Sequence, residues 1–161
     1  MSNVQLIRFA TSADDVEQAR VLFREYAASL NVDLCFQNFD EELATLPGAY
    51  APPCGRLLLG GPTERPLGCI ALRPLPNGDP AIGEVKRLYV RPDARGTGLG
   101  RALVRHVLDD ALAIGYRELK LDTLPTMNAA RALYESLGFR DCAAYYRNPI
   151  GGVSYMSLTL T

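Results

Sequence analysis

The segment "RGTGLGR" at 95–101 holds three glycines and two arginines. It connects a run of strand character to a run with helical spacing, so it stands where a helix begins. A helix N-terminus presents unpaired N–H groups and a partial positive charge, and both bind anions. Glycine adds no Cβ, so phosphate oxygens can approach the backbone closely. These residue types and their spacing predict a phosphate-binding loop, to which Arg95 and Arg101 add charge-assisted contacts.

Two widespread phosphate motifs do not fit this loop. The dinucleotide pattern GxGxxG requires a third glycine at the position of Arg101. The nucleoside-triphosphate loop requires a lysine and then Ser or Thr after its last glycine, whereas this chain continues "GLGRAL". A glycine loop can also be purely structural. The loop alone therefore leaves both phosphate binding and a structural turn open.

The elements around the loop follow from hydrophobic periodicity and from Gly and Pro breakers. We expect strands at 4–10, 56–61, 66–75, 81–90, 117–123, 139–146 and 153–160. We expect helices at 11–30, 39–46, about 98–114 and 126–137, the third of them closed by Gly115. The order β-α-α-β-β-β-α-β-α-β-β predicts one mixed α/β domain over 1–161.

Composition and charge are those of an ordinary globular chain: 161 residues, 48% of them hydrophobic and 22% charged. A formal net charge of −1 gives no general attraction to nucleic acid or to an anionic membrane. The apolar runs are too short to span a bilayer, and the N-terminus lacks the basic start of a secretory signal. We therefore expect a cytoplasmic protein without nucleic-acid or membrane partners.

The four cysteines, Cys35, Cys54, Cys69 and Cys142, form no CxxC pair, and His106 is the single histidine. This pattern does not predict a metal site, and free thiols in a reducing cytosol are the simpler interpretation. Cys69 and Cys142 lie within apolar strand patterns, so we expect them in the core. His106 is expected to be structural.

The sequences "EVKRLYVRPDARGTGLGRALVRHVL" and "LKLDTLPTMNAARALYESLGF" resemble the acetyl-CoA-binding core of the GNAT acetyltransferases. Arg95, Gly98 and Gly100 match that superfamily's signature of Arg or Gln, two residues, Gly, one residue, then Gly or Ala. The resemblance is specific over about 82–140 and looser before it, although 31–56 resembles a bacterial branch that acts on small molecules. It favours acetyl-CoA as the ligand of the loop.

The resemblance implies a mixed, mostly antiparallel twisted sheet of about seven strands flanked by about four helices, with central strands that splay apart. Interrupted alternation along 81–90 also favours a bulge in that strand. Acetyl-CoA would lie in the gap, with an N–H near Leu88 polarising the thioester carbonyl. The residues expected to contact it are Leu88, Tyr89, Val90, Arg95, Gly96, Thr97, Gly98, Leu99, Gly100, Arg101, Asn128 and Tyr134.

Acetyl transfer to an amine requires a base, because a free alkyl amine has a pKa of about 10, and an acid for the departing thiolate. The resemblance implies Glu84 as the base; its structural alternative is an ion pair with Lys86 or Arg87. It implies Tyr134 as the acid, and packing in an apolar helical stripe is the alternative. Asn128 would contact the pantetheine arm or simply cap its helix.

The acceptor pocket is expected in the variable parts of such a fold. Its candidate lining residues are Phe36, Gln37, Phe39, Tyr50, Arg73, Tyr145, Tyr146 and Asn148. Arg73 or Arg87 at the pocket mouth would favour an acceptor with a carboxylate, such as an amino acid. No cysteine lies in a recognisable acyl-transfer motif, which favours direct transfer from thioester to amine.

The sequence thus favours an N-acetyltransferase that moves acetyl from acetyl-CoA to a primary amine of a small molecule. An enzyme acting on protein N-termini or lysines is one alternative, and a non-catalytic acyl-CoA-binding sensor is another. The region 31–55 is expected to cover the place that an open peptide groove would need. A homodimer is compatible with this kind of fold.

Overall fold

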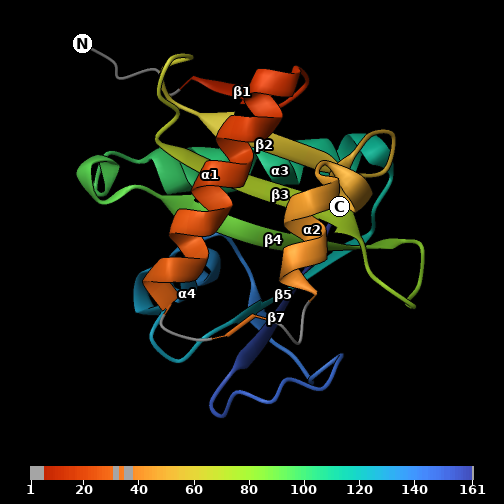
Figure 1. The fold of residues 1–161 in the computed structure, drawn as a ribbon. Helices are drawn as coiled ribbons and strands as arrows, with labels where there is room; N and C mark the ends of the chain where they lie inside the picture. The colour runs from red at the N-terminus through yellow and green to blue at the C-terminus, as the bar shows by residue number, and fades with distance from the viewer. Residues whose placement is uncertain (1–5, 31–32, 35–37, 161) are drawn as a thin grey trace.

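A computed structural model of the chain describes residues 6–30, 33–34 and 38–160. One seven-stranded sheet runs through it, with helices against both faces (Figure 1). The strands are β1 (Ile7–Phe9), β2 (Arg56–Gly60), β3 (Gly68–Pro74), β4 (Ile82–Val90), β5 (Glu118–Thr123), β6 (Arg140–Asp141) and β7 (Ser154–Thr159). The helices are α1 (Ala13–Leu30), α2 (Phe39–Thr45), α3 (Leu99–Ile114) and α4 (Asn128–Ser136), with 3₁₀ turns at Gly48–Tyr50 and Pro92–Ala94.

The strand order is β1-β2-β3-β4-β5-β7-β6, and only β4 and β5 pair in parallel. Their pairing covers Ile82 to Glu84 against Glu118 to Lys120 and then stops, although both strands continue. The two central strands therefore separate, and we call the place where they part the fork. The predicted mostly antiparallel sheet with splayed central strands is confirmed.

A bulge interrupts β4 close to the fork. Ala71 of β3 lies opposite Lys86, whereas Cys69 lies opposite Tyr89, so β4 uses one residue more than β3 over this stretch. Arg87 takes up the extra length with a φ of 63°. The predicted bulge is confirmed, and because of it Lys86 and Tyr89 face the same side of the sheet although they are three residues apart.

Two apolar cores fill the two faces of the sheet. The core between the sheet and helices α3 and α4 includes Val85, Leu103 and Phe139. The core on the opposite side includes Phe23 and Leu59. On this side α1 and α2 lie in front of the sheet in Figure 1. Helical spacing on α1 and α3 and the buried runs of β2 and β3 produce these cores, as hydrophobic periodicity predicts.

The strand predicted at 139–146 is wrong beyond its first residues, because only Arg140–Asp141 joins the sheet as β6. The chain then leaves the sheet, and two hydroxyls tie it elsewhere: Tyr145 donates to Glu84 and Tyr146 donates to Asp122. Side-chain hydrogen bonds to buried carboxylates thus replace the ladder that a strand would form. Cys142 lies in this segment and is half-buried, whereas Cys69 is fully buried as predicted.

The helices and acidic residues also bear on membrane and metal binding. Within the described ranges, no helix combines the length and apolar character needed to cross a bilayer. Among the same residues, no group of three or more His, Cys, Asp or Glu side chains is arranged to hold a metal ion. His106 pairs with Asp110 at 3.1 Å and packs edge-on against Phe9, which is a structural role.

Candidate active site

The loop between β4 and α3 has the conformation that its glycines predict. Gly96 and Gly98 have φ values of 78° and 88°, in the left-handed region that favours glycine. A Cβ at either position would have no neighbour within 4 Å, so this backbone borders open space. Gly98 precedes α3 without any side-chain cap, which leaves the first N–H groups of the helix available to an anion.

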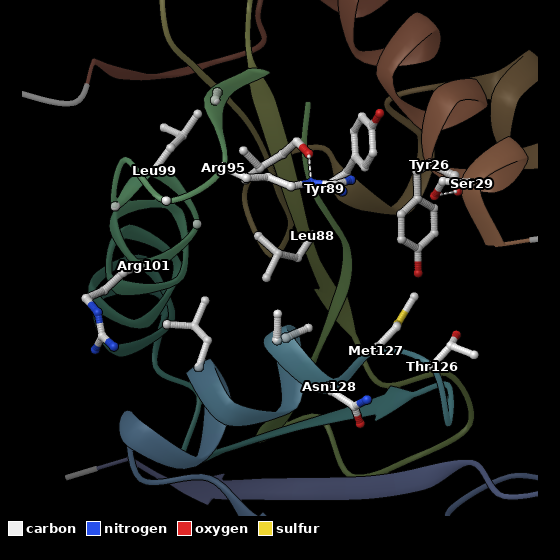
Figure 2. Close-up of a pocket in the computed structure, with 18 of the residues that line it drawn as sticks. Tyr26, Ser29, Leu88, Tyr89, Arg95, Leu99, Arg101, Thr126, Met127 and Asn128 are labelled. Carbon is white, nitrogen blue, oxygen red and sulfur yellow. Dashed lines mark hydrogen bonds between the residues drawn. The ribbon is translucent and has the colours of Figure 1, made fainter. Parts of the chain in front are cut away.

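The rest of the loop is held by its own hydrogen bonds. Thr97 donates its hydroxyl to the carbonyl of Ala94 at 2.6 Å. Arg95 donates from Nε to the carbonyl of Val90 at 3.1 Å, the contact dashed in Figure 2. A Cβ on Gly100 would meet Leu133 at an ordinary distance of 3.5 Å, so this glycine is not sterically required. The loop is therefore ordered around an exposed backbone concavity.

A groove of about 610 Å³ runs from this loop along β4 to α4. Ten of the twelve residues predicted to contact acetyl-CoA line it: Leu88, Tyr89, Val90, Arg95, Gly96, Gly98, Leu99, Gly100, Arg101 and Asn128. Figure 2 shows Leu88 between the loop and α3 on one side and Tyr26 with Met127 on the other. Thr97 does not line the groove, because its hydroxyl serves the loop itself.

Sequence reasoning missed the wall that α1 contributes to this groove. Tyr26, Ser29 and Leu30, in the last turns of α1, line it together with Thr126 and Met127 before α4. The helical spacing of α1 predicts an apolar face, but it gives no information on where the end of that helix crosses the sheet. Asn128 is the first residue of α4 and makes no side-chain capping bond there, so its predicted alternative role as a cap is not seen.

A smaller cavity of about 40 Å³ lies at the fork and adjoins the groove. The two share Tyr26, Leu30, Leu88, Met127 and Ala130 as lining residues. Tyr134 lines the smaller cavity, and its ring also packs on Phe139 with centroids 5.4 Å apart. Burial raises the pKa of the Tyr134 hydroxyl, so it stays protonated at neutral pH. Both predicted roles of Tyr134, packing and a position near the thioester, are compatible with this placement.

Glu84 is buried and engaged at both carboxylate oxygens. Arg73 donates from Nε and Nη2 to Oε1 at 2.8 Å, and Tyr145 donates to Oε2 at 2.7 Å. Lys86 lies at 4.0 Å from Oε2, the limit of an ion pair. The main partner is thus Arg73, across the β3–β4 pair, rather than Lys86 or Arg87. Glu84 does not line the groove or the smaller cavity.

Three charged residues outside the predicted catalytic pair line the smaller cavity: Lys86, Arg87 and Asp122. Lys86 Nζ lies 3.5 Å from Asp122 Oδ1, and Asp122 also accepts a hydrogen bond from Tyr146. Burial lowers the pKa of Lys86, and the charges of Asp122 and Glu84 oppose this shift only in part. The sequence predicts Lys86 only as an ion-pair partner of Glu84, although alternation along β4 puts both side chains on one face of the sheet.

The predicted acceptor-side residues Arg73, Tyr145, Tyr146 and Asn148 belong to two neighbouring hydrogen-bonded groups, one on Glu84 and one on Asp122. Asn148 donates to the hydroxyl of Tyr146 at 2.9 Å, and Tyr145 and Tyr146 pack edge to face with ring centroids 5.3 Å apart. Tyr155 packs against both rings at 5.4 and 5.5 Å. Together they place a polar, aromatic segment over Glu84 and Asp122.

The other predicted acceptor-side residues lie elsewhere. Phe39 and Tyr50 are buried in the core on the α1 and α2 side of the sheet, where Arg87 stacks over the ring of Phe39 at 5.1 Å. Tyr50 also lines a cavity beside α2 together with Arg73. Arg87 lines the smaller cavity at the fork, and it is buried and bonded twice to Glu42 at 2.9 Å. Phe36 and Gln37 lie outside the described residues.

Comparison with known proteins agrees with this geometry. The family model described as the acetyltransferase (GNAT) family matches residues 19–139. An uncharacterized N-acetyltransferase from Schizosaccharomyces pombe is 41% identical over 148 residues, which are 91% of this chain and 90% of that protein. A GNAT acetyltransferase structure from Staphylococcus aureus superposes with a TM-score of 0.79 at 16% identity, over 98% of this chain and 100% of the other.

A structure of yncA from Salmonella typhimurium, described as a putative acetyltransferase with its cofactor acetyl-CoA, superposes with a TM-score of 0.73 at 23% identity, covering 99% of this chain and 95% of that one. These similarities of fold agree with the family match and with the 41% identical relative from Schizosaccharomyces pombe. The glycine loop at the start of α3, the groove along β4 and the paired part of β4 and β5 all lie within the matched residues 19–139. The chain therefore belongs to the GNAT family and is an acetyltransferase that uses acetyl-CoA.

Proposed function

We propose that the enzyme transfers acetyl from acetyl-CoA directly to a primary amine of a small molecule, such as an amino acid or a related metabolite. The observation that carries this proposal is the enclosed, charged acceptor side of the fork. There Tyr145 and Tyr146 donate hydrogen bonds to Glu84 and Asp122, and the cavity that Asp122 lines with Lys86 is only about 40 Å³. Such a site suits a small polar acceptor better than an extended peptide.

The groove fits acetyl-CoA on its own geometry. Gly96 and Gly98 form a concavity that any Cβ would fill, at the positive end of α3. In our proposal the N–H groups of this loop and Arg95 and Arg101 at its edges hold the pyrophosphate. Backbone groups of Leu88 to Val90 and the side chain of Asn128 hold the pantetheine arm. Acetyl-CoA supplies the acetyl group as an activated thioester.

Leu88 and Tyr134 have separate roles at the thioester. The N–H of Leu88 stabilises the negative charge that develops on the carbonyl oxygen, and a preorganised donor of this kind contributes about 3 kcal/mol. Tyr134 gives its proton to the departing thiolate; its buried hydroxyl is protonated at neutral pH and lines the cavity with Leu88. Both carboxylate oxygens of Glu84 already accept hydrogen bonds, from Arg73 and from Tyr145. Glu84 therefore acts as the base indirectly, through groups in contact with it.

Direct transfer is favoured over a cysteine acyl-enzyme. Cys54, Cys69 and Cys142 line neither the groove nor the smaller cavity. Cys69 is fully buried, and burial raises the pKa of its thiol, which opposes formation of the nucleophilic thiolate. Cys35 lies outside the described residues. The acceptor amine is therefore the nucleophile in our proposal.

Arg73 supports an acceptor with a carboxylate. Its side chain is 25% exposed and uses Nε and Nη2 on Glu84. Burial would lower the pKa of Arg73, but the carboxylate of Glu84 reverses this shift, so the guanidinium keeps its charge. Arg73 also borders a cavity of about 210 Å³ beside α2. A planar cation next to such a space is the usual partner of a carboxylate.

The test has two stages. Titration calorimetry with acetyl-CoA is expected to show micromolar binding, which corresponds to about 8 kcal/mol. Thiol release is then followed with a panel of free amino acids, other small amines and peptides. Turnover with one class of small amine supports the proposal. Turnover with peptides alone would assign a protein acetyltransferase, and binding without turnover of any amine would assign an acyl-CoA sensor.

A further inference from the structure

The fork is closed by an ion pair rather than by backbone hydrogen bonds. The last paired residues of β4 and β5 are Glu84 and Lys120; β4 continues to Val90 and β5 to Thr123, and Lys86 and Asp122 lie two residues beyond the last pair. Alternation puts Lys86 on the face of Glu84 and Asp122 on the face of Lys120. At the second position beyond the end of the ladder, Lys86 Nζ and Asp122 Oδ1 are 3.5 Å apart.

This pair borders the space where the reaction is proposed to take place. Lys86 and Asp122 line the same small cavity as Leu88 and Tyr134. Glu84 does not line it and has both oxygens occupied, but its Oε2 lies 4.0 Å from Lys86 Nζ. A proton that leaves an amine in this cavity therefore meets Lys86 before it can reach Glu84.

We propose that Lys86 is the group that takes the proton from the acceptor's ammonium, and that Asp122 and Glu84 hold Lys86 in place and stabilise the charge it gains. This inference rests on the proposed function and adds to it the direct proton acceptor. Glu84 then acts through Lys86, as a positioning residue. The simpler alternative is a structural ion pair that only closes the sheet.

The proton and electron pairs balance in this scheme. The neutral amine of Lys86 takes one proton from the acceptor's ammonium, whose nitrogen lone pair then forms the C–N bond with the thioester carbon. The C–S bond breaks, and its electron pair leaves on sulfur. The thiolate gains a proton from Tyr134, and the tyrosinate that remains takes the second proton of the new amide nitrogen. Lys86 then passes its proton to the carboxylate of Asp122, which lies 3.5 Å away and whose side chain is 11% exposed, and from there the proton reaches solvent.

The surroundings of Lys86 favour the uncharged amine form of its side chain. Its side chain is 6% exposed among β3, β4, β5 and α4, and burial lowers its pKa. The charged groups that face it are Asp122 and Glu84, which raise the pKa, and Arg87 and Arg73, which lower it. Tyr26 from α1, Tyr134 from α4 and the segment with Tyr145 and Tyr146 supply the titratable hydroxyls around this network.

Lys86→Arg tests the proposal, because arginine keeps the positive charge beside Asp122 but does not release its proton. Lys120→Arg, at the other lysine of the chain, is the matched control. We expect Lys86→Arg to keep its melting temperature and to bind acetyl-CoA within threefold of wild type. Its kcat should fall at least about 100-fold near neutral pH and approach wild type at a pH near the acceptor's own pKa.

Asp122→Asn provides a second test should the arginine variant fold poorly. Because the Asp122 carboxylate raises the pKa of Lys86, its removal should move the acid limb of the kcat profile to lower pH and leave that limb present. Loss of the limb in Asp122→Asn would make Asp122 itself the base and overturn the proposal. Wild-type kcat in Lys86→Arg, or an acetyl group found on Lys86 by intact mass, would overturn it too. An inactive wild type across all amines would instead refute the proposed function.

Discussion

Gly98→Asp separates coenzyme binding from folding at the loop before α3. The residue has a φ of 88° and precedes the first turn of the helix, and a side chain there would enter open space. The new carboxylate would stand where we expect the pyrophosphate of acetyl-CoA. It would therefore meet a like charge in the complex but a favourable helix dipole in the free enzyme.

The two effects differ in size. At about 5 Å and an effective dielectric constant of about 20, one carboxylate repels one phosphate charge by about 3 kcal/mol, which is roughly a hundredfold in Kd. Left-handed backbone destabilises most L residues by about 1–2 kcal/mol, and Asp less. A negative charge at the helix N-terminus stabilises the fold by about 0.3–1 kcal/mol. The folded state should therefore change by less than about 1 kcal/mol, or roughly 4 °C in Tm.

Titration calorimetry with acetyl-CoA at low and moderate salt, together with thermal unfolding, measures both effects. Gly98→Asn is the control, since it has the same shape without the charge. We expect Gly98→Asn to weaken binding modestly and Gly98→Asp to weaken it roughly a hundredfold more, by an amount that shrinks as salt screens the charges. Equal affinities of the two variants, both stably folded, would refute phosphate binding at this loop.

Three further predictions concern other parts of the molecule. Tyr134→Phe should lower kcat by about 100-fold or more without weakening acetyl-CoA binding, as judged by thiol release and calorimetry. Glu42→Ala leaves the charge of Arg87, whose side chain is 2% exposed, without its carboxylate and should lower the unfolding free energy by about 3–5 kcal/mol in urea titrations. Glu41→Ala, exposed on the same helix, should change it little. Burial raises the pKa of Tyr116 to about 12. Because the folded state then holds this proton more tightly, stability is full below pH 10 and falls as pH rises toward 12, and Tyr116→Phe should reduce that fall.

Features that depend on neighbours in sequence could be predicted well. The glycine loop, the bulge in β4 and the Gly115 end of α3 each follow from residue types within a few positions. Gly115, for example, has a φ of 110° and donates to the carbonyls of Ala111 and Leu112, as its place after the helical pattern indicates. Most residues of the predicted coenzyme contacts therefore line one groove.

Features that depend on partners far along the chain could not be predicted from the sequence. Glu84 pairs with Arg73 because the β3–β4 register puts them side by side, and nothing within either segment specifies that register. The apolar residues before Tyr145 resemble a strand, yet two hydroxyls bonded to distant carboxylates draw the chain off the sheet. Alternation indicates which face a residue occupies, but not which acid or base will meet it there.

The three charges of β4 show what the fork requires of the fold. Glu84, Lys86 and Arg87 are 2%, 6% and 4% exposed, and burial of an unpaired charge in a sheet would destabilise it by several kcal/mol. Their partners come from β3, β5 and α2 respectively. Apolar residues of similar volume would often stabilise such positions as well or better. The charges instead fix three surrounding elements on one strand, at the point where it leaves β5, and so hold the walls around the position that we propose for the thioester.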